Sequence, residues 1–363
     1  MDFFETAFKI AKNHGFEMTG AYSPEKETFL ANKFSERKKK GHIVFLGSEN
    51  ENIMFDPKKY WGKCKSVISL ALSYNIIPKC TETNDSGMMS KVSSGIDYHH
   101  VIGDKLKAVV RELKDIYPHF DCVFQVDVGP LSDRAAAWHS GLGFYGKNSF
   151  VINPDYGSWI FLAQILTDQE YQLESVKIPD GCKECKNCIK ACPTGAIKEN
   201  YDFNGKLCIS YLTQKKETLT LSERRAMGKH LYGCDICQEV CPYNKKSKEG
   251  KEKSFFSDCS KRYPELKYVL KLDKNSYENY YKKTSSAWRG RRLLQRNAVI
   301  VCGNIRNKEN LELLHQTVKD PRPEIRLYSL FSLAEYGEDQ KPLIERQLGQ
   351  EDEDFKIKYN DYK

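Results

Sequence analysis

The spacing of the cysteines in the middle of the chain constrains its fold more than any other feature. The run Cys182-x2-Cys185-x2-Cys188-x3-Cys192 is followed directly by Pro193. This spacing is typical of ferredoxin loops that bind a cubane iron–sulfur cluster. Three closely spaced thiolates can cap three irons of one cube, while the proline directs the fourth thiolate to a second cluster. The run therefore predicts a segment built around [4Fe–4S] clusters.

A second, altered copy of the run follows, Cys234-x2-Cys237-x3-Cys241-Pro242, and Cys208 lies upstream of it. In two-cluster ferredoxins the ligands cross between the two runs. Crossing them here predicts two sets of four ligands. The first set is Cys182, Cys185, Cys188 and Cys241, and the second set is Cys192, Cys208, Cys234 and Cys237.

Two zinc sites are the alternative interpretation of these eight cysteines, because zinc also binds paired CxxC motifs. We favour iron and sulfur, since three closely spaced cysteines exceed what one loop of a tetrahedral zinc site needs. A radical-SAM site is disfavoured because the order of its x3 and x2 spacings is reversed in the second run. The remaining five of the 13 cysteines have no ligand spacing, and we expect no redox role for Cys64, Cys80, Cys122, Cys259 and Cys302.

Length and composition favour a cytoplasmic protein of two or three domains. The chain has 363 residues, 57 Lys+Arg against 49 Asp+Glu, a net charge of +8 and 40% apolar residues. The mean hydropathy is −0.62, and no apolar run approaches the roughly 18 residues that a membrane span needs. The first residues carry charges at helical spacing and predict an amphipathic helix instead of a signal peptide. In a reducing compartment, clustered cysteines are more often metal ligands than disulfides.

The pattern along the chain predicts an α+β protein with three parts. Residues 1–175 form an α/β domain, with helical spacing at 2–14 and 97–117. Residues 176–258 form the ferredoxin-like module for two [4Fe–4S] clusters, and residues 259–363 form an all-helical domain. Four apolar runs in the first part predict strands at Val67–Tyr74, Cys122–Val128, Phe150–Ile152 and Ser158–Leu166.

The helical third part contains two similar paired-helix segments, 296–320 and 325–349. Their offset is close to 30 residues and aligns Arg296 with Arg326. Repeated helix pairs of this kind predict a short HEAT-like solenoid. The alternative interpretation is an unrelated four-helix bundle.

Iron–sulfur clusters alone make an electron conduit, so another group must carry the chemistry, and the first domain is the place for it. The sequence has no GxGxxG after a strand, no GxxxxGK[ST] and no DxHxxG motif for base-off cobalamin. Spacing by itself therefore predicts an iron–sulfur redox enzyme whose cofactor is not identified.

Several motifs resemble those of the epoxyqueuosine reductases. They are VDVGPLSDRAAAWHSGLGFYGKN at 126–148, the cysteine runs at 182–197 and 231–245, SSAWRGRRLLQRNA at 285–298 and KDPRPEIR at 319–326, so the resemblance covers nearly the whole chain. It implies a corrinoid-binding first domain, cobalamin and two [4Fe–4S] clusters. It also implies reduction of the epoxide of epoxyqueuosine in tRNA to a cyclopentene, with loss of water.

The resemblance also implies roles for single residues. Asp127 matches the proton donor of the family. From local sequence alone, an Asp that follows a strand and precedes Gly129-Pro130 is more often an Asx-turn residue. A proton donor at neutral pH needs a raised pKa, which burial beside an apolar corrin face would provide. His99 is a candidate second polar group, or else a local helix cap. The other positions that match cobalamin contacts are Val151, Leu162, Ser210, Asp235 and Ile236.

Basic residues near the start of the helical part favour an RNA substrate, because Arg and Lys neutralise phosphates. The alternative is a solvated helix face. The candidate tRNA contacts are Lys215, Lys216, Arg289, Arg291, Arg292 and Arg296. We expect a monomer that takes electrons from an external donor of the flavodoxin or ferredoxin type. The competing functions are a corrinoid reductase of the dehalogenase type acting on a small molecule, and an electron carrier or RNA-binding scaffold without a corrin.

Overall fold

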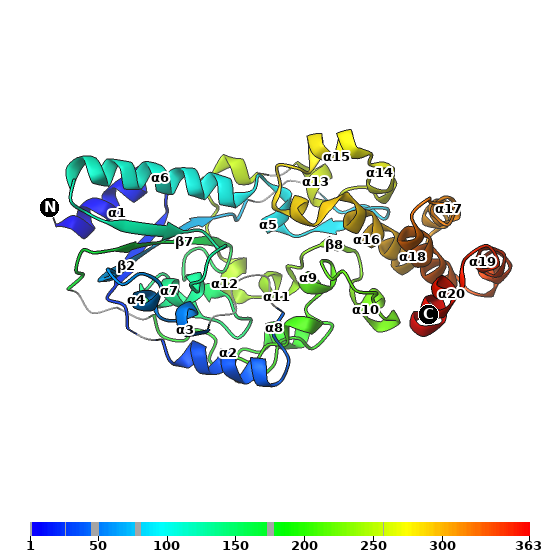
Figure 1. Cartoon of the computed structure of the whole chain (residues 1–363), viewed down its shortest axis with the longest axis horizontal. Helices are drawn as coiled ribbons and strands as arrows, with labels where there is room; N and C mark the ends of the chain where they lie inside the picture. The colour runs from blue at the N-terminus through cyan, green and yellow to red at the C-terminus, as the bar shows by residue number, and fades with distance from the viewer. Residues whose placement is uncertain (1, 26, 45–50, 77–80, 173–177, 257) are drawn as a thin grey trace. The chain divides into compact units, whose positions relative to one another are not determined.

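The computed structural model describes residues 2–25, 27–44, 51–76, 81–172, 178–256 and 258–363 (Figure 1). Cys80 lies outside these ranges. The chain folds into two compact units, and each combines three stretches of sequence. The first unit holds residues 1–77, 97–206 and 236–256, and the second holds 78–96, 207–235 and 257–363. The predicted ferredoxin-like segment therefore contributes to both units.

The first unit is built on a four-stranded antiparallel sheet with the order β1-β2-β7-β4. The two central strands are buried along nearly their whole length, which explains why their sequences are continuous apolar runs. The predicted strands at 67–74, 122–128 and 158–166 are confirmed, although the second ends before Val126. The bounds are β1 Met18–Tyr22, β2 Ser66–Ser73, β4 Cys122–Gln125 and β7 Ile160–Thr167.

Helices cover both faces of this sheet. Figure 1 shows α1 (Phe3–Asn13) and α6 (Tyr98–Ile116) along one face and α7 (Asp133–His139) on the other. The side chain of Asp97 caps α6 by accepting the His99 backbone N–H at 3.1 Å. Both long helices were predicted from their periodicity. The shorter helices of the N-terminal part are α2 Phe29–Lys39, α3 Glu51–Met54 and α4 Pro57–Tyr60.

Short elements carry the cysteine-rich part of the first unit. A hairpin of β5 (Phe144–Tyr145) and β6 (Val151–Ile152) confirms the predicted strand at 150–152. Beyond it lie α8 Asn187–Ala191, α11 Ile236–Glu239, α12 Pro242–Lys245 and the 3-10 turn η2 Lys253–Phe255. The chain passes from the first unit to the second within the turn η1 Gly205–Leu207.

The second unit begins with a two-stranded parallel sheet of β3 (Met88–Met89) and β8 (His230–Tyr232). Met89 is fully buried there, although its polar surroundings in the sequence suggest an exposed loop. The helices before residue 290 are short. They are α5 Lys91–Ser94, α9 Ile209–Leu212, α10 Leu221–Ala226, α13 Cys259–Arg262, α14 Leu266–Lys271, α15 Lys274–Tyr280 and the 3-10 turn η3 Ser285–Arg289.

The C-terminal end of the second unit is helical in all of its described elements. Its central helix α16 (Gly290–Ile305) packs against α14, α17 and α18, so Leu293–Gly303 are all buried. No helix in the described ranges is long and apolar enough to cross a membrane. The following elements are α17 Lys308–Thr317, α18 Pro323–Ala334, η4 Glu338–Gln340, α19 Lys341–Leu348 and α20 Glu353–Tyr362.

Candidate active site

The first unit contains a cavity of about 420 Å³, a size in the range of small-molecule sites. Its walls come from α2, β7, the β5–β6 hairpin and the segment that follows β4. Three of the predicted site residues line it, namely Asp127, Val151 and Leu162. Aromatic and aliphatic side chains alternate in the wall with charged ones, among them Arg37, His42, Asp133 and Arg134.

Asp127 lies at the centre of a tight turn just after β4. Its φ is +51°, and the Val128 backbone N–H donates to the Val126 carbonyl over 2.5 Å. This is a γ-turn of the rare type with positive φ, which is strained for a residue other than glycine. Its side chain is 61% exposed. The chain thus presents a carboxylate to the cavity on a backbone that the surrounding structure must restrain.

Two side chains from the start of α6 contact the Asp127 carboxylate. The Tyr98 hydroxyl donates to Oδ2 over 2.5 Å, and His99 Nε2 lies 3.4 Å from the same oxygen. The Tyr98 ring stacks on Phe161 of β7 with 4.1 Å between centroids, which fixes the hydroxyl. Burial raises the pKa of Tyr98, so the hydroxyl remains a donor.

The contacts with Tyr98 and His99 determine the pKa of Asp127. Desolvation by the cavity wall raises its pKa, but the ion pair with His99 and the hydrogen bond from Tyr98 outweigh it, and the pKa lies below its usual value. The raised pKa expected from burial beside a corrin face stays a prediction. Asp127 is ionised here at neutral pH.

His99 is the group that holds a proton beside Asp127. Its Nδ1 lies 2.7 Å from Asp97 Oδ1, while Nε2 faces Asp127. Burial lowers the pKa of His99, but the two carboxylates raise it more, to about 9. His99 is therefore an imidazolium at neutral pH, in contact with the predicted proton donor. The capping role of this position falls to Asp97 instead.

Asp133 is a site residue that the sequence analysis missed. Its Oδ2 accepts the Asp127 backbone N–H at 2.8 Å, and its Oδ1 accepts Nε2 of Gln125 at 2.9 Å and Nε2 of Gln164 at 2.6 Å. Burial and the charge of Asp127 raise its pKa to about 7 in spite of these bonds. Its position just after Ser132, the residue that caps α7, was the signal available in the sequence.

The first predicted set of cluster ligands lies entirely in the first unit. Cys182 and the buried Cys241 pack with Phe144 and Ile152. Burial, followed by charge on other thiols of the set, raises the pKa of Cys182, Cys188 and Cys241. Backbone N–H groups of Lys147, Tyr243 and Asn244 partly offset this rise in the pKa of Cys182 and Cys241. Gathered thiols with N–H donors fit a thiolate-bound cluster. No disulfide joins any of the cysteines that the structure describes.

The second predicted set is divided between the units. Cys192 and Cys237 belong to the first unit, and Cys208 and Cys234 belong to the second. Burial raises the pKa of Cys192, but bonds from Thr194 and from nearby backbone N–H groups lower it below its usual value. These N–H groups stabilise the thiolate form of Cys192.

The three remaining predicted cobalamin contacts are also divided between the units. Ser210 and Asp235 belong to the second unit, while Ile236 begins α11 in the first. The Asp235 side chain is buried in the second unit, where it accepts the Lys91 backbone N–H at 2.7 Å and pairs with Arg262 at 3.0 Å. The Asp235 side chain is therefore engaged in contacts within the second unit.

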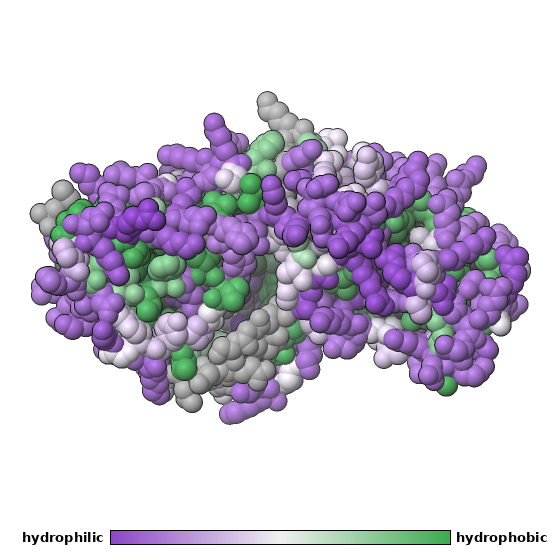
Figure 2. Space-filling view, turned by 45° about the horizontal axis from the view of Figure 1, so that its top comes forward, coloured by the Kyte–Doolittle hydropathy of each residue, from purple (hydrophilic) through white to green (hydrophobic). Residues whose placement is uncertain are grey.

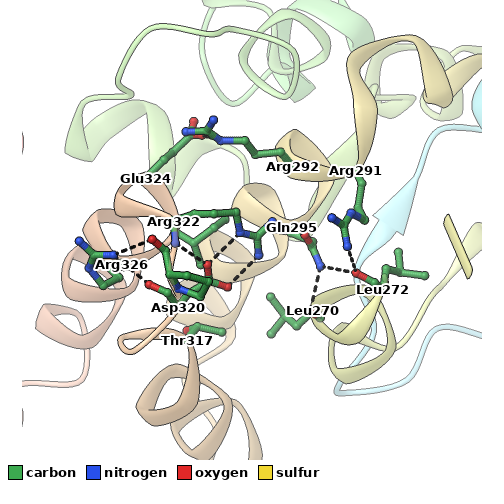
Figure 3. Close-up of polar contacts among 12 residues, drawn as sticks. Leu270, Leu272, Arg291, Arg292, Gln295, Thr317, Asp320, Arg322, Glu324 and Arg326 are labelled. Atoms are coloured by element: carbon green, nitrogen blue, oxygen red, sulfur yellow. Dashed lines mark hydrogen bonds and ion pairs between the residues drawn. The ribbon is translucent and has the colours of Figure 1, made fainter. Parts of the chain in front are cut away.

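The basic residues predicted to bind tRNA differ sharply in their surroundings. Arg296 is fully buried, so its prediction as an RNA contact is wrong. Figure 3 shows Arg291 donating to the Leu272 carbonyl at 2.7 Å, and Arg292 beside Glu324. Lys215 pairs with Glu223 at 2.7 Å. Of the remaining two, Lys216 is exposed and Arg289 is half-buried. The Arg289 guanidinium stacks on the exposed Trp288, with its Cζ 3.7 Å from the ring centroid.

Two family profiles match the chain. Residues 55–128 match the profile described as epoxyqueuosine reductase QueG, DUF1730, and residues 181–244 match the 4Fe-4S double cluster binding domain. The second match decides between the interpretations of the eight cysteines: the chain carries a [4Fe–4S] double-cluster domain and not a pair of zinc sites.

Curated relatives and solved structures are similar over most of the chain. The epoxyqueuosine reductase of Bacillus subtilis is 32% identical over 92% of this chain and 88% of the relative, and that of Listeria monocytogenes is 34% identical over 83% and 80%. A crystal structure of an epoxyqueuosine reductase with an epoxyqueuosine-modified tRNA-Tyr stem loop has a TM-score of 0.91 at 30% identity, covering 98% of this chain and 96% of the other. A structure of the Bacillus subtilis enzyme, with its catalytic aspartate loop swung out of the active site, has a TM-score of 0.90 at 30% identity and the same coverage.

Proposed function

The chain belongs to the epoxyqueuosine reductase family. We propose that Asp127 is the proton donor when this enzyme reduces epoxyqueuosine in a tRNA anticodon loop. The carbon–oxygen bonds of the epoxide break, two electrons and two protons are consumed, and an alkene and water are formed. A relative bound to an epoxyqueuosine-modified tRNA stem loop supports this substrate. The observation that carries the proposal is the exposed Asp127 carboxylate at the cavity wall, in contact with protonated His99.

Cobalamin is the cofactor that we propose for the cavity. Val151, Ile160 and Leu162 offer apolar surface to a flat ring. Within the described ranges, Arg37 Nε and His42 Nδ1 are buried at the cavity without a hydrogen-bond partner, which suits the amide groups around a corrin. When bound, cobalamin supplies a strongly reducing cobalt centre, and the clusters supply it with single electrons. Contacts through Ser210, Asp235 and Ile236 stay predictions of the family resemblance.

Asp127 and His99 would manage the protons of the reaction. At neutral pH the proton resides on His99 and not on Asp127, since their pKa values are shifted in opposite directions. The two side chains are 3.4 Å apart, so a small movement brings Nε2 within hydrogen-bond distance of Oδ2. We infer that His99 protonates Asp127 and that Asp127 passes the proton to the oxygen leaving the epoxide. Tyr98 orients the carboxylate during this transfer.

The remaining roles concern the clusters and the RNA. The gathered thiols of Cys182, Cys185, Cys188 and Cys241 would hold one cluster, and Cys192, Cys208, Cys234 and Cys237 the other. The C-terminal helices would form the HEAT-like part that binds tRNA. Lys216, Arg289 and Arg292 are the exposed or half-buried cations that we retain as candidate phosphate contacts.

The test is anaerobic reconstitution of the full chain with iron, sulfide and cobalamin, followed by assay on tRNA carrying epoxyqueuosine. We expect iron and cobalt in the purified protein, and nucleosides in which epoxyqueuosine has lost one oxygen atom. A small organohalide serves as the competing substrate. Dehalogenation without conversion of the tRNA, or a protein that takes up iron but never cobalt, would overturn the proposal.

A further inference from the structure

The turn that carries Asp127 does not hold itself in place. Its single internal hydrogen bond, from Val128 N–H to the Val126 carbonyl, closes a strained conformation, and Val128 at its tip is 79% exposed. A strained, exposed turn opens unless groups outside it oppose the opening. The restraint must therefore come from the wall beneath the turn.

We propose that Asp133 is the positioning residue for the catalytic turn, acting with Gln125 and Gln164 as a clamp that holds the Asp127 backbone in place. This inference rests on the proposed role of Asp127. The central contact is the 2.8 Å bond from the Asp127 N–H to Asp133 Oδ2. Asp133 itself begins helix α7, whose Ala135, Ala136 and Ala137 are buried, so it belongs to the rigid part of the unit.

Two glutamines fix the clamp from the sheet. Gln164 of the central strand β7 is buried and donates to Asp133 Oδ1 at 2.6 Å. Gln125, the last residue of β4, donates to the same oxygen at 2.9 Å. It also binds the far end of the turn, because its Nε2 reaches the Leu131 carbonyl at 2.8 Å and its Oε1 accepts the Leu131 N–H at 3.3 Å.

The clamp therefore ties both ends of the segment 126–131 to β4, β7 and α7. The two oxygens of one carboxyl group accept all three hydrogen bonds, which suits an aspartate at this position. The role of Asp133 is to keep the Asp127 carboxylate at the cavity wall, and not to contact a reacting atom.

The decisive variant is Asp133→Asn in the reconstituted enzyme. Its NH2 group replaces one carboxylate oxygen and faces either the Asp127 N–H or the two glutamine donors, so at least one bond of the clamp is lost. We expect backbone hydrogen exchange in residues 126–131 to rise about 10-fold, as for one lost hydrogen bond. We expect kcat for modified tRNA to fall about 10- to 100-fold, while KM changes less than about 2-fold, because misplacement affects the reaction and not binding.

The matched control is Asp168→Asn, which makes the same change at the opposite end of β4. Asp168 Oδ1 accepts the Asp121 backbone N–H at 3.1 Å, and neither residue lines the cavity. We expect the control to leave exchange in 126–131 and kcat unchanged. If Asp133→Asn does not fold, Gln164→Met provides the test, since it removes the 2.6 Å donor to Asp133 and should loosen the same segment.

Two results would overturn the clamp: unchanged exchange in 126–131, or increased exchange with unchanged kcat. A failure of the proposed proton donor is distinguishable from either one. In that case Asp127→Asn retains turnover, while hydrogen exchange in Asp133→Asn still reports whether the turn is held.

Discussion

In the first unit the Asp127 carboxylate is 61% exposed on a strained turn, whereas in the second unit the Arg296 guanidinium is fully buried and saturated with acceptors. Arg296 donates to the carbonyls of Lys215 and Leu212 and to the Asn297 side chain. The Asp127 carboxylate is accessible to a substrate, whereas the Arg296 guanidinium is not. A charged residue in a motif therefore indicates a binding or catalytic role only where its charged group is not already buried and hydrogen-bonded by the rest of the chain.

The same contrast extends to the surface of the second unit. Arg322 forms a bidentate pair with Asp320, and Arg326 donates to the Asp320 carbonyl (Figure 3). Arg326 also pairs with Glu351, so both arginines of KDPRPEIR are engaged within the helical part. Figure 2 shows hydrophilic residues over most of the C-terminal helices. Much of this surface charge is paired, and we expect RNA affinity to depend on few of its residues.

The largest effect should come from the cysteines of the two units. Cys188→Ser removes one thiolate from the gathered set in the first unit, and we expect about half of the iron to be lost and turnover to fall to background. The control is Cys302→Ala, at a buried position of α16 in the second unit. It should cost about 1 kcal/mol of stability and keep all the iron. Full iron in Cys188→Ser would contradict the ligand assignment.

Arg296→Met tests whether the second unit uses this arginine for folding. The change removes the donors to the Lys215 carbonyl and to the Asn297 side chain, and one of the two donors to the Leu212 carbonyl. We expect the free energy of unfolding to fall by about 3–5 kcal/mol in urea titrations. Arg292→Gln, at a side chain 61% exposed and paired with Glu324, should cost less than about 1 kcal/mol. A variant Arg296→Met that is as stable as the wild type but binds RNA more weakly would contradict a structural role for Arg296.

His99→Gln should lower the stability less than Arg296→Met does, and its effect should depend on pH. Because the folded-state pKa of His99 is raised from its ordinary 6.5 to about 9, its stabilisation is complete below pH 6.5 and disappears as the pH rises through 9. We expect the wild type to exceed His99→Gln in free energy of unfolding by about 1–3 kcal/mol at about pH 6, and by much less above pH 9. A difference that does not vary with pH would show that His99 is not charged in the folded chain.

Patterns within short stretches of sequence predicted the individual strands and helices. Continuous apolar runs identified β2 and β7, and helical spacing identified α6 with its Asp97 cap. The short cysteine spacings predicted a segment for two [4Fe–4S] clusters, and the family profile over residues 181–244 confirms it. These features depend on neighbours in sequence.

The features that were missed depend on contacts between distant segments. The helix α16 is buried on all sides from Leu293 to Gly303, so Arg296 looks like a surface residue only while its partners at 212–215 are unknown. Likewise, Asp133 owes its role to Gln164, 31 residues away. The lowered pKa of Asp127 comes from His99 and Tyr98 at the start of α6, about 30 residues earlier in the chain. Spacing along one motif does not reveal such partners.

The most direct test of the central claim is a single-turnover measurement with Asp127→Asn and wild-type enzyme, both fully loaded with iron and cobalt. We predict that the variant binds modified tRNA as tightly as the wild type and converts it about 100- to 10,000-fold more slowly, because the amide cannot protonate the leaving oxygen. Conversion at the wild-type rate would contradict the assignment of Asp127 as the group that the first unit presents to the substrate.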